Sequence, residues 1–94
     1  MNEFFASLGK RWQRAAERRG VMIDEPGLDA RVADELLELA RVAAHTKERR
    51  FAPLATYTAG IAAERLRVAK GAGDDTIAAV IREVREELER EAPA

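Results

Sequence analysis

The sequence of 94 residues has no cysteine, a single histidine and only five aromatic side chains. Without cysteine the chain cannot form disulfides or thiolate metal sites, which fits the reducing cytoplasm, where we expect the protein to reside. No apolar run approaches the ~20 residues that a membrane-spanning helix needs. The start "MNEFFASLGKRW" has Glu3 before its apolar residues and no long hydrophobic stretch, so we do not expect a secretory signal.

Strand patterns, internal repeats and low-complexity tracts are also missing, whereas helical periodicity runs through the chain. Hydrophobic residues make up 47% of the sequence and charged residues 35%, which is the balance of a soluble globular protein. The length predicts a single helical domain over residues 1–94. Because short connections favour antiparallel neighbours, we expect an all-α fold, a compact bundle of four helices.

Hydrophobic spacing and helix-end signals place the first two helices. The first should begin after Asn2, run to about Arg19 and end at Gly20, with the apolar stripe Phe4, Phe5, Leu8 and Trp12. Val21 and Ile23 in the following connection are expected to tuck inward. The second helix should start around Leu28–Asp29, with Asp29 as the expected cap, and continue to about His45.

The third helix should have Pro53 in its first turn and run to about Lys70. Its expected contact face consists of Leu54, Thr58, Ile61, Ala62, Arg65 and Leu66. The turn "GAGDD" then leads into the fourth helix, with Asp74 or Asp75 as cap. Pairs spaced four residues apart should decorate that helix: Arg82–Glu86, Arg85–Glu89 and Glu86–Arg90. We expect the core to contain Leu36, Leu39, Ile61 and Ile81.

The charge is spread unevenly along the chain. Residues 1–20 carry five basic side chains against two acidic ones, for +3, and residues 74–94 carry seven acidic against three basic ones, for −4. We expect the two end segments to lie near each other and offset their charges. The isoelectric point near 5.9 argues against a nucleic-acid partner.

The connection between the second and third helices is the least generic part of the chain. It supplies the candidate binding surface His45, Glu48, Arg49, Arg50 and Tyr57. Arginine next to an aromatic ring can bind phosphate or stack on a base, but the same residues can form a structural latch through an Arg–Glu or His–Glu contact. We expect an ordered connection in which Phe51 packs inward.

Gly60 lies in the middle of the third helix, where glycine costs about 1 kcal/mol relative to alanine. Its neighbours include several alanines, so the helix presents a small-residue surface. Close approach of another helix, from the same chain or from a second copy, is the simplest reason to keep this glycine.

No enzymatic motif is present. The sequence has no phosphate-binding glycine loop, no paired-histidine metal motif and no Ser/His/Asp set, and "GAGDD" lacks the spaced oxygen ligands of a calcium loop. We therefore expect neither enzymatic activity nor a metal or other cofactor.

Residues 36–63, "LLELARVAAHTKERRFAPLATYTAGIAA", resemble a small helical domain-of-unknown-function family of actinobacteria and related bacteria. The resemblance lies in Ala44–His45, Glu48–Arg49, Ala52–Pro53–Leu54 and the run from Thr56 to Gly60. Members of that family look like stand-alone proteins or appendages to molybdenum-cofactor guanylyltransferase-like proteins. The resemblance implies at most an accessory role near that pathway and brings no catalytic residue.

These observations lead to two functional hypotheses. The first is a helical interaction or accessory module, a possible homodimer or binder of another protein, whose recognition surface includes residues 45–57. The alternative is a small-molecule or phosphate-binding accessory domain linked to molybdenum-cofactor biosynthesis.

Overall fold

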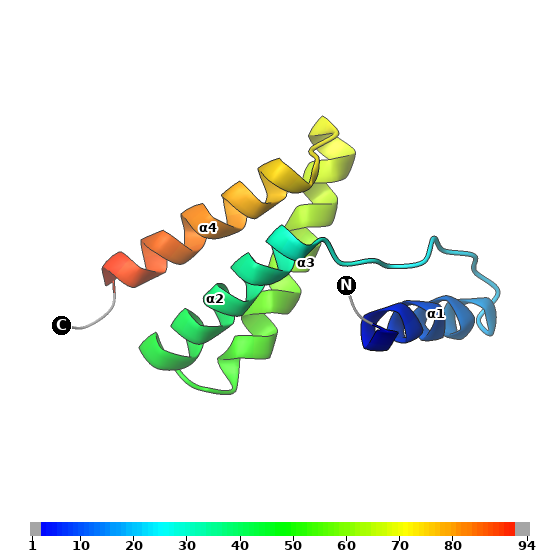
Figure 1. Cartoon of the computed structure of the whole chain (residues 1–94), viewed down its shortest axis with the longest axis horizontal. Coiled ribbons are helices and arrows are strands. Elements are labelled where there is room, and N and C mark those ends of the chain that lie inside the picture. Colours follow the sequence, from blue (N-terminus) through cyan, green and yellow to red (C-terminus); the bar gives the residue numbers. More distant parts are fainter. Residues whose placement is uncertain (1–2, 92–94) are drawn as a thin grey trace. The chain divides into compact units, whose positions relative to one another are not determined.

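The computed structural model describes residues 3–91 and contains four helices, with no strand in this range (Figure 1). The helices are α1 (Glu3–Glu17), α2 (Ala30–Thr46), α3 (Phe51–Lys70) and α4 (Asp74–Glu91). They hold 79% of the described residues. The prediction of an all-α fold with four helices is confirmed.

Contacts within the chain group its residues into two units, Met1–Ala30 and Arg31–Ala94. The N-terminal unit contains α1 and the connection 18–29, and the C-terminal unit contains α3, α4 and all but the first residue of α2. The connection of residues 18–29 is long, whereas α2, α3 and α4 follow one another after a few residues. That residues 1–94 form one domain remains a prediction.

The predicted helix ends agree with the structure to within a few residues. Gly20 has φ +81°, its N–H donates to the Glu17 carbonyl (2.9 Å), and the next N–H, of Val21, donates to the Ala16 carbonyl (3.0 Å). This is the Schellman arrangement, in which a left-handed residue lets the chain satisfy the last carbonyls of the helix. α2 begins directly after Asp29, as predicted, and Pro53 lies in the first turn of α3.

In the N-terminal unit, the connection after α1 folds back along that helix. The Lys10 ammonium contacts the Glu25 carboxylate (3.1 Å), and Gln13 Nε2 donates to the Ile23 carbonyl (3.1 Å). A Cβ on Gly9 would lie 2.5 Å from the Pro26 carbonyl oxygen, so only glycine permits this close approach. Val21 and Ile23 are exposed, and the expectation that they tuck inward is wrong. Polar groups and backbone anchor this connection instead.

The C-terminal unit has an apolar core shared by α2 and α4. Its buried cluster consists of Val32, Leu39, Ile77, Ala78 and Ile81. Ile77 is 1% exposed and is the most deeply buried large side chain. Leu39 and Ile81 confirm the predicted core, and Leu36 packs against the cluster while half-buried. Ile61 is half-buried and lies outside the cluster.

The predicted contact face of α3 is rotated relative to the observed one. The residues that pack against the core are Ala55, Ala59 and Ala63, which recur every four residues and form one row along the helix. Leu54, Thr58 and Arg65 are exposed. No residue of α3 is buried, in contrast to α2 and α4.

Candidate functional site

The five side chains predicted as a binding surface are all exposed. His45 lies in the last turn of α2, Tyr57 lies in the second turn of α3, and Glu48, Arg49 and Arg50 belong to the connection 47–50. They lie at the end of the C-terminal unit where the connection 47–50 joins α2 to α3 (Figure 1). Tyr57 is 70% exposed, so its ring and hydroxyl group are available to a partner.

The connection 47–50 contains an Arg–Glu contact, one of the two contacts by which it could form a structural latch. Arg50 Nε donates to Glu48 Oε2 (3.1 Å), and the Arg50 guanidinium lies 5.9 Å from the centre of the Phe51 ring. Glu48 contacts Arg50 rather than His45. Phe51 is 39% exposed, so the prediction that it packs inward is wrong. As the first residue of α3, it lies at the rim of the unit, with the arginine above its ring.

Phe51 also lines an open hollow of about 300 Å³ at this end of the unit. The other lining residues are Ala43, Thr46, Lys47, Leu54, Ala55, Thr58 and Leu88. None of the five predicted surface residues is among them. The predicted polar side chains therefore do not line the hollow and do not converge on a point inside it.

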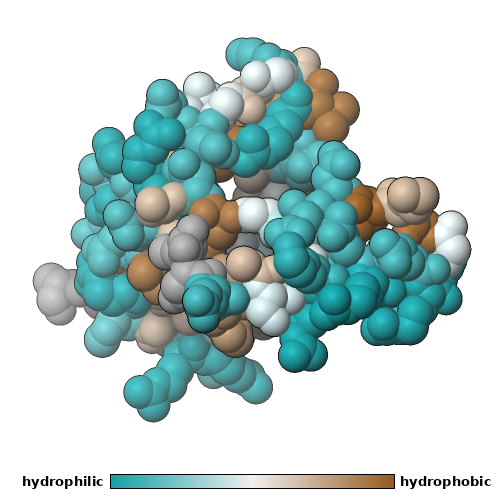
Figure 2. Space-filling model, turned by 45° about the vertical axis from the view of Figure 1, so that its right-hand side comes forward, coloured by the Kyte–Doolittle hydropathy of each residue, from teal (hydrophilic) through white to brown (hydrophobic). Residues whose placement is uncertain are grey.

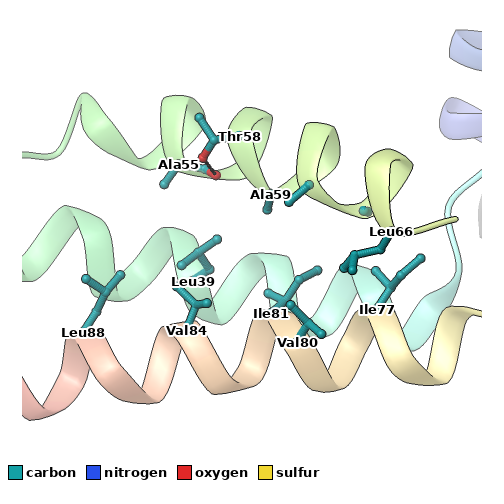
Figure 3. Close-up of a pocket in the computed structure, with 12 residues that line it drawn as sticks. Leu39, Ala55, Thr58, Ala59, Leu66, Ile77, Val80, Ile81, Val84 and Leu88 are labelled. Atoms are coloured by element: carbon teal, nitrogen blue, oxygen red, sulfur yellow. Dashed lines mark hydrogen bonds between the residues drawn. The ribbon is translucent and has the colours of Figure 1, made fainter. Parts of the chain in front are cut away.

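A larger apolar groove of about 360 Å³ runs between α3 and α4 (Figure 3). Leu39 of α2 forms its floor. The α3 wall consists of Ala55, Thr58, Ala59, Ala62, Ala63 and Leu66, and the α4 wall of Ile77, Val80, Ile81, Val84 and Leu88. The groove shares Ala55, Thr58 and Leu88 with the hollow, so the two form one continuous apolar surface.

The groove is lined by a single polar side chain, and its hydroxyl group is already hydrogen-bonded to the backbone. Thr58 Oγ1 donates to the Ala55 carbonyl one turn earlier (2.8 Å). Ligand sites for small polar molecules place a few polar groups so that they converge on the ligand, and this groove offers no such set. Its chemistry suits the apolar side chains of another polypeptide.

A buried carboxylate that the sequence analysis missed connects α2 to α4. Glu35 is 8% exposed; its Oε2 accepts from Arg82 Nε (2.8 Å) and its Oε1 from Arg85 Nη2 (3.3 Å). Arg85 also donates to Glu89 (2.6 Å), the one predicted i,i+4 pair seen on α4. The signal was available, since Glu35 lies three residues after Val32 and four before Leu39 and so shares their buried face.

The arginines determine the charge state of this carboxyl group. Burial raises the pKa of Glu35, but hydrogen bonds and charge from Arg82 and Arg85 outweigh burial and leave the pKa below its ordinary value of 4.5. Hydrogen bonds from Arg85 to Glu89 and Glu35 raise the pKa of the guanidinium. Glu35 is therefore ionised at neutral pH and fully committed to structural contacts, unlike a carboxylate held ready for proton transfer.

Two further features are absent from the described residues 3–91. They contain no cluster of three or more histidine or carboxylate side chains arranged to hold a metal ion. None of the four helices combines the length and the apolar character that crossing a membrane requires.

The sequence profile of a family described as "Domain of unknown function (DUF6457)" matches residues 6–94. The chain belongs to this family. The match covers α2, α3 and α4 and all but the first three residues of α1. No curated protein and no solved structure shows significant similarity to the chain.

Proposed function

We propose that this DUF6457 protein is a non-catalytic helical interaction module that binds a protein partner through its C-terminal unit. The observation that carries the proposal is the continuous apolar surface formed by the groove and the adjoining hollow. Contiguous apolar surface that stays open to water marks sites of association in soluble proteins. Hydrophobic side chains also reach the surface between hydrophilic ones on the face drawn in Figure 2.

The residues around the hollow strengthen this proposal. Aromatic residues and arginine are enriched in protein interfaces and supply most of their binding energy. Phe51 with Arg50 above its ring, the exposed Leu54 and the exposed Tyr57 form such a group at the start of α3. A partner that covers the hollow would contact the surface at residues 45–57 that the sequence singled out.

An enzymatic role has less support. Catalysis by His45 would need a group that orients the imidazole, and among the described residues the His45 side chain has no hydrogen-bond or ion-pair partner. The other unusual ionisable group, Glu35, is held by two arginines on the opposite helix.

The alternative is a phosphate-binding accessory domain near molybdenum-cofactor biosynthesis, which would use His45, Arg49, Arg50 and Tyr57. The exposed basic residues of the connection support it, but Glu48 already neutralises Arg50. Titration with inorganic phosphate separates the two proposals. A saturable shift of the Tyr57 ring signals in the NMR spectrum, abolished in Arg49→Ala, would favour the alternative.

Site-specific photo-crosslinking in cells tests the interaction module. A photoreactive amino acid at Tyr57 should give discrete crosslinked adducts, because this position borders the proposed surface. Val68 is 79% exposed and lies outside both the groove and the hollow, so the same amino acid there is a matched control. Absence of adducts at Tyr57, or the same adducts at both positions, would contradict the proposal.

A further inference from the structure

We infer that the partner of the groove is a second copy of this chain, related by a two-fold axis that sets α3 of each copy against α4 of the other. The inference rests on the proposed function and names the partner. A two-fold interface uses the same surface on both copies, so that surface must be complementary to itself. The groove meets this condition in shape and in charge.

The two rims of the groove carry opposite charges. On α4, Glu83 and Glu87 are exposed. Glu83 follows the lining residue Val80 by three positions, and Glu87 follows Val84 by three, so each glutamate neighbours a lining valine on the helix surface. On α3, Arg65 is exposed and follows the lining residue Ala62 by the same spacing. The α4 rim therefore carries the carboxylates of Glu83 and Glu87, and the α3 rim carries the guanidinium of Arg65.

A second copy turned by 180° sets its α3 rim against the α4 rim of the first copy. In the same way, the α3 rim of the first copy meets the α4 rim of the second. Arg65 of each copy then meets Glu83 and Glu87 of the other, and these three side chains have no ion-pair partner among residues 3–91. A partner of a single charge would satisfy one rim and be repelled by the other. The pattern thus favours a copy of the same surface.

The shape of the groove agrees with this arrangement. α3 and α4 meet at the turn 71–73 and diverge from it (Figure 1), and Leu39 of α2 lies between them (Figure 3). The alanines of the α3 wall leave room for side chains of a neighbouring helix. Val84 on the α4 wall is 43% exposed and would supply such a side chain to the other copy.

Sedimentation of the full-length protein tests the inference directly. The wild type should form a dimer, and Val84→Glu should weaken the dimer at least tenfold because it places a charge in an apolar interface. Val68→Glu is the matched control: it introduces the same charge on an exposed valine outside the groove and should leave the dimer unchanged. Circular dichroism must show that both variants keep their helices.

Charge reversal tests the proposed pairing across the two-fold axis. Arg65→Glu in one chain, or Glu83→Arg with Glu87→Arg in another, should each weaken self-association by about tenfold, since every reversed contact occurs twice per dimer. Mixing the two variants should restore a dimer that contains one chain of each kind, because both contacts then join opposite charges.

The outcomes separate this inference from the proposed function. A wild-type protein that stays monomeric at about 100 times its concentration in the crosslinked cells would overturn the two-fold dimer. Adducts at Tyr57 would then show that a different protein occupies the groove. A dimer that Val84→Glu does not weaken, or variants that fail to pair on mixing, would show that the copies meet elsewhere. A dimer that behaves as expected in both experiments supports the inference.

Discussion

The two units of this protein are held together by different kinds of contact. The C-terminal unit buries an apolar cluster centred on Ile77 and a carboxylate shared by two arginines. In the N-terminal unit, Gly9 is the only buried residue of α1, and the connection is fixed by a backbone approach, an ion pair and one amide hydrogen bond. Stability should therefore respond to side-chain volume in the C-terminal unit and to backbone fit in the N-terminal unit.

The largest expected effect comes from the core of the C-terminal unit. Ile77→Ala should lower the free energy of unfolding by roughly 2–5 kcal/mol, because it leaves a cavity where a large side chain was fully buried. Chemical denaturation followed by circular dichroism measures this loss. Ile61→Ala is the matched control, since the half-buried Ile61 lies outside the cluster and should cost clearly less. Equal losses would mean that α3 is buried more deeply than described.

Removing the negative charge of Glu35 should have the next largest effect. Glu35→Gln keeps the shape but leaves two arginines without their anion, for a loss of about 3 kcal/mol. This figure is at the low end for buried pairs because the Arg82 side chain is more than half exposed. Glu86→Gln, an exposed glutamate of α4 that lies outside the groove and its rims, is the control and should be nearly neutral. A neutral Glu35→Gln would show that the two arginines are satisfied by water.

The same carboxylate predicts how stability depends on pH. The pKa of Glu35 is below 4.5 in the folded protein, so its contribution is complete at neutral pH and is lost as the pH falls from about 4.5 through the lower folded value. Wild-type stability should therefore decline more steeply below pH 4.5 than that of Glu35→Gln, and the gap between them should narrow. Parallel acid titrations of the two proteins measure this, and parallel curves would contradict it.

Gly9→Ala should break the N-terminal unit alone. The new Cβ would lie 2.5 Å from the Pro26 carbonyl oxygen, a backbone atom that cannot move without displacing the connection, and the expected loss is about 1–3 kcal/mol. Trp12 is the only tryptophan and lies in α1, so its fluorescence reports this unit. The fluorescence transition should shift while the circular dichroism transition of the other helices stays in place. A shift of both together would show that the units unfold as one.

The smallest effect has the opposite sign. A Cβ on Gly60 meets nothing within 4 Å among the described residues, so Gly60→Ala should stabilise α3 by about 1 kcal/mol through helix propensity. Gly9 and Gly60 both lie inside helices, and the same substitution separates a glycine that the fold requires from one that it does not. A loss of stability that grows with protein concentration would show that a second copy packs against Gly60.

Much of the fold could be predicted because its signals are local. The helix boundaries near Gly20 and Pro53 follow from the backbone chemistry of those two residues. The core positions of Leu39 and Ile81 follow from the spacing of apolar residues along each helix. The contact face of α3 could not be predicted in this way. Its larger residues suggest that they pack against the core, whereas alanines make that contact. That choice depends on how closely α2 and α4 approach, which a one-dimensional pattern does not contain.

The candidate site was predicted less completely, for a related reason. The polar residues at 45–57 could be singled out because they differ from a generic helical sequence, but they are exposed and do not line the hollow. The groove itself consists of residues that look like ordinary core, such as Val80 and Val84, and only the arrangement of the helices leaves them open. Glu35 was overlooked because its partners lie 47 and 50 residues away in the sequence.

The Glu35 contact also has a consequence for the rotational orientation of α4. One carboxylate accepts from two arginines three residues apart, so α4 cannot turn about its own axis without losing one of them. This fixed rotation keeps Val80, Val84 and Leu88 directed into the groove. Apolar residues in place of the three charges would remove this restraint on the rotation of α4, even where the replacement is neutral or stabilising. The charged contact thus fixes which side chains of α4 line the groove.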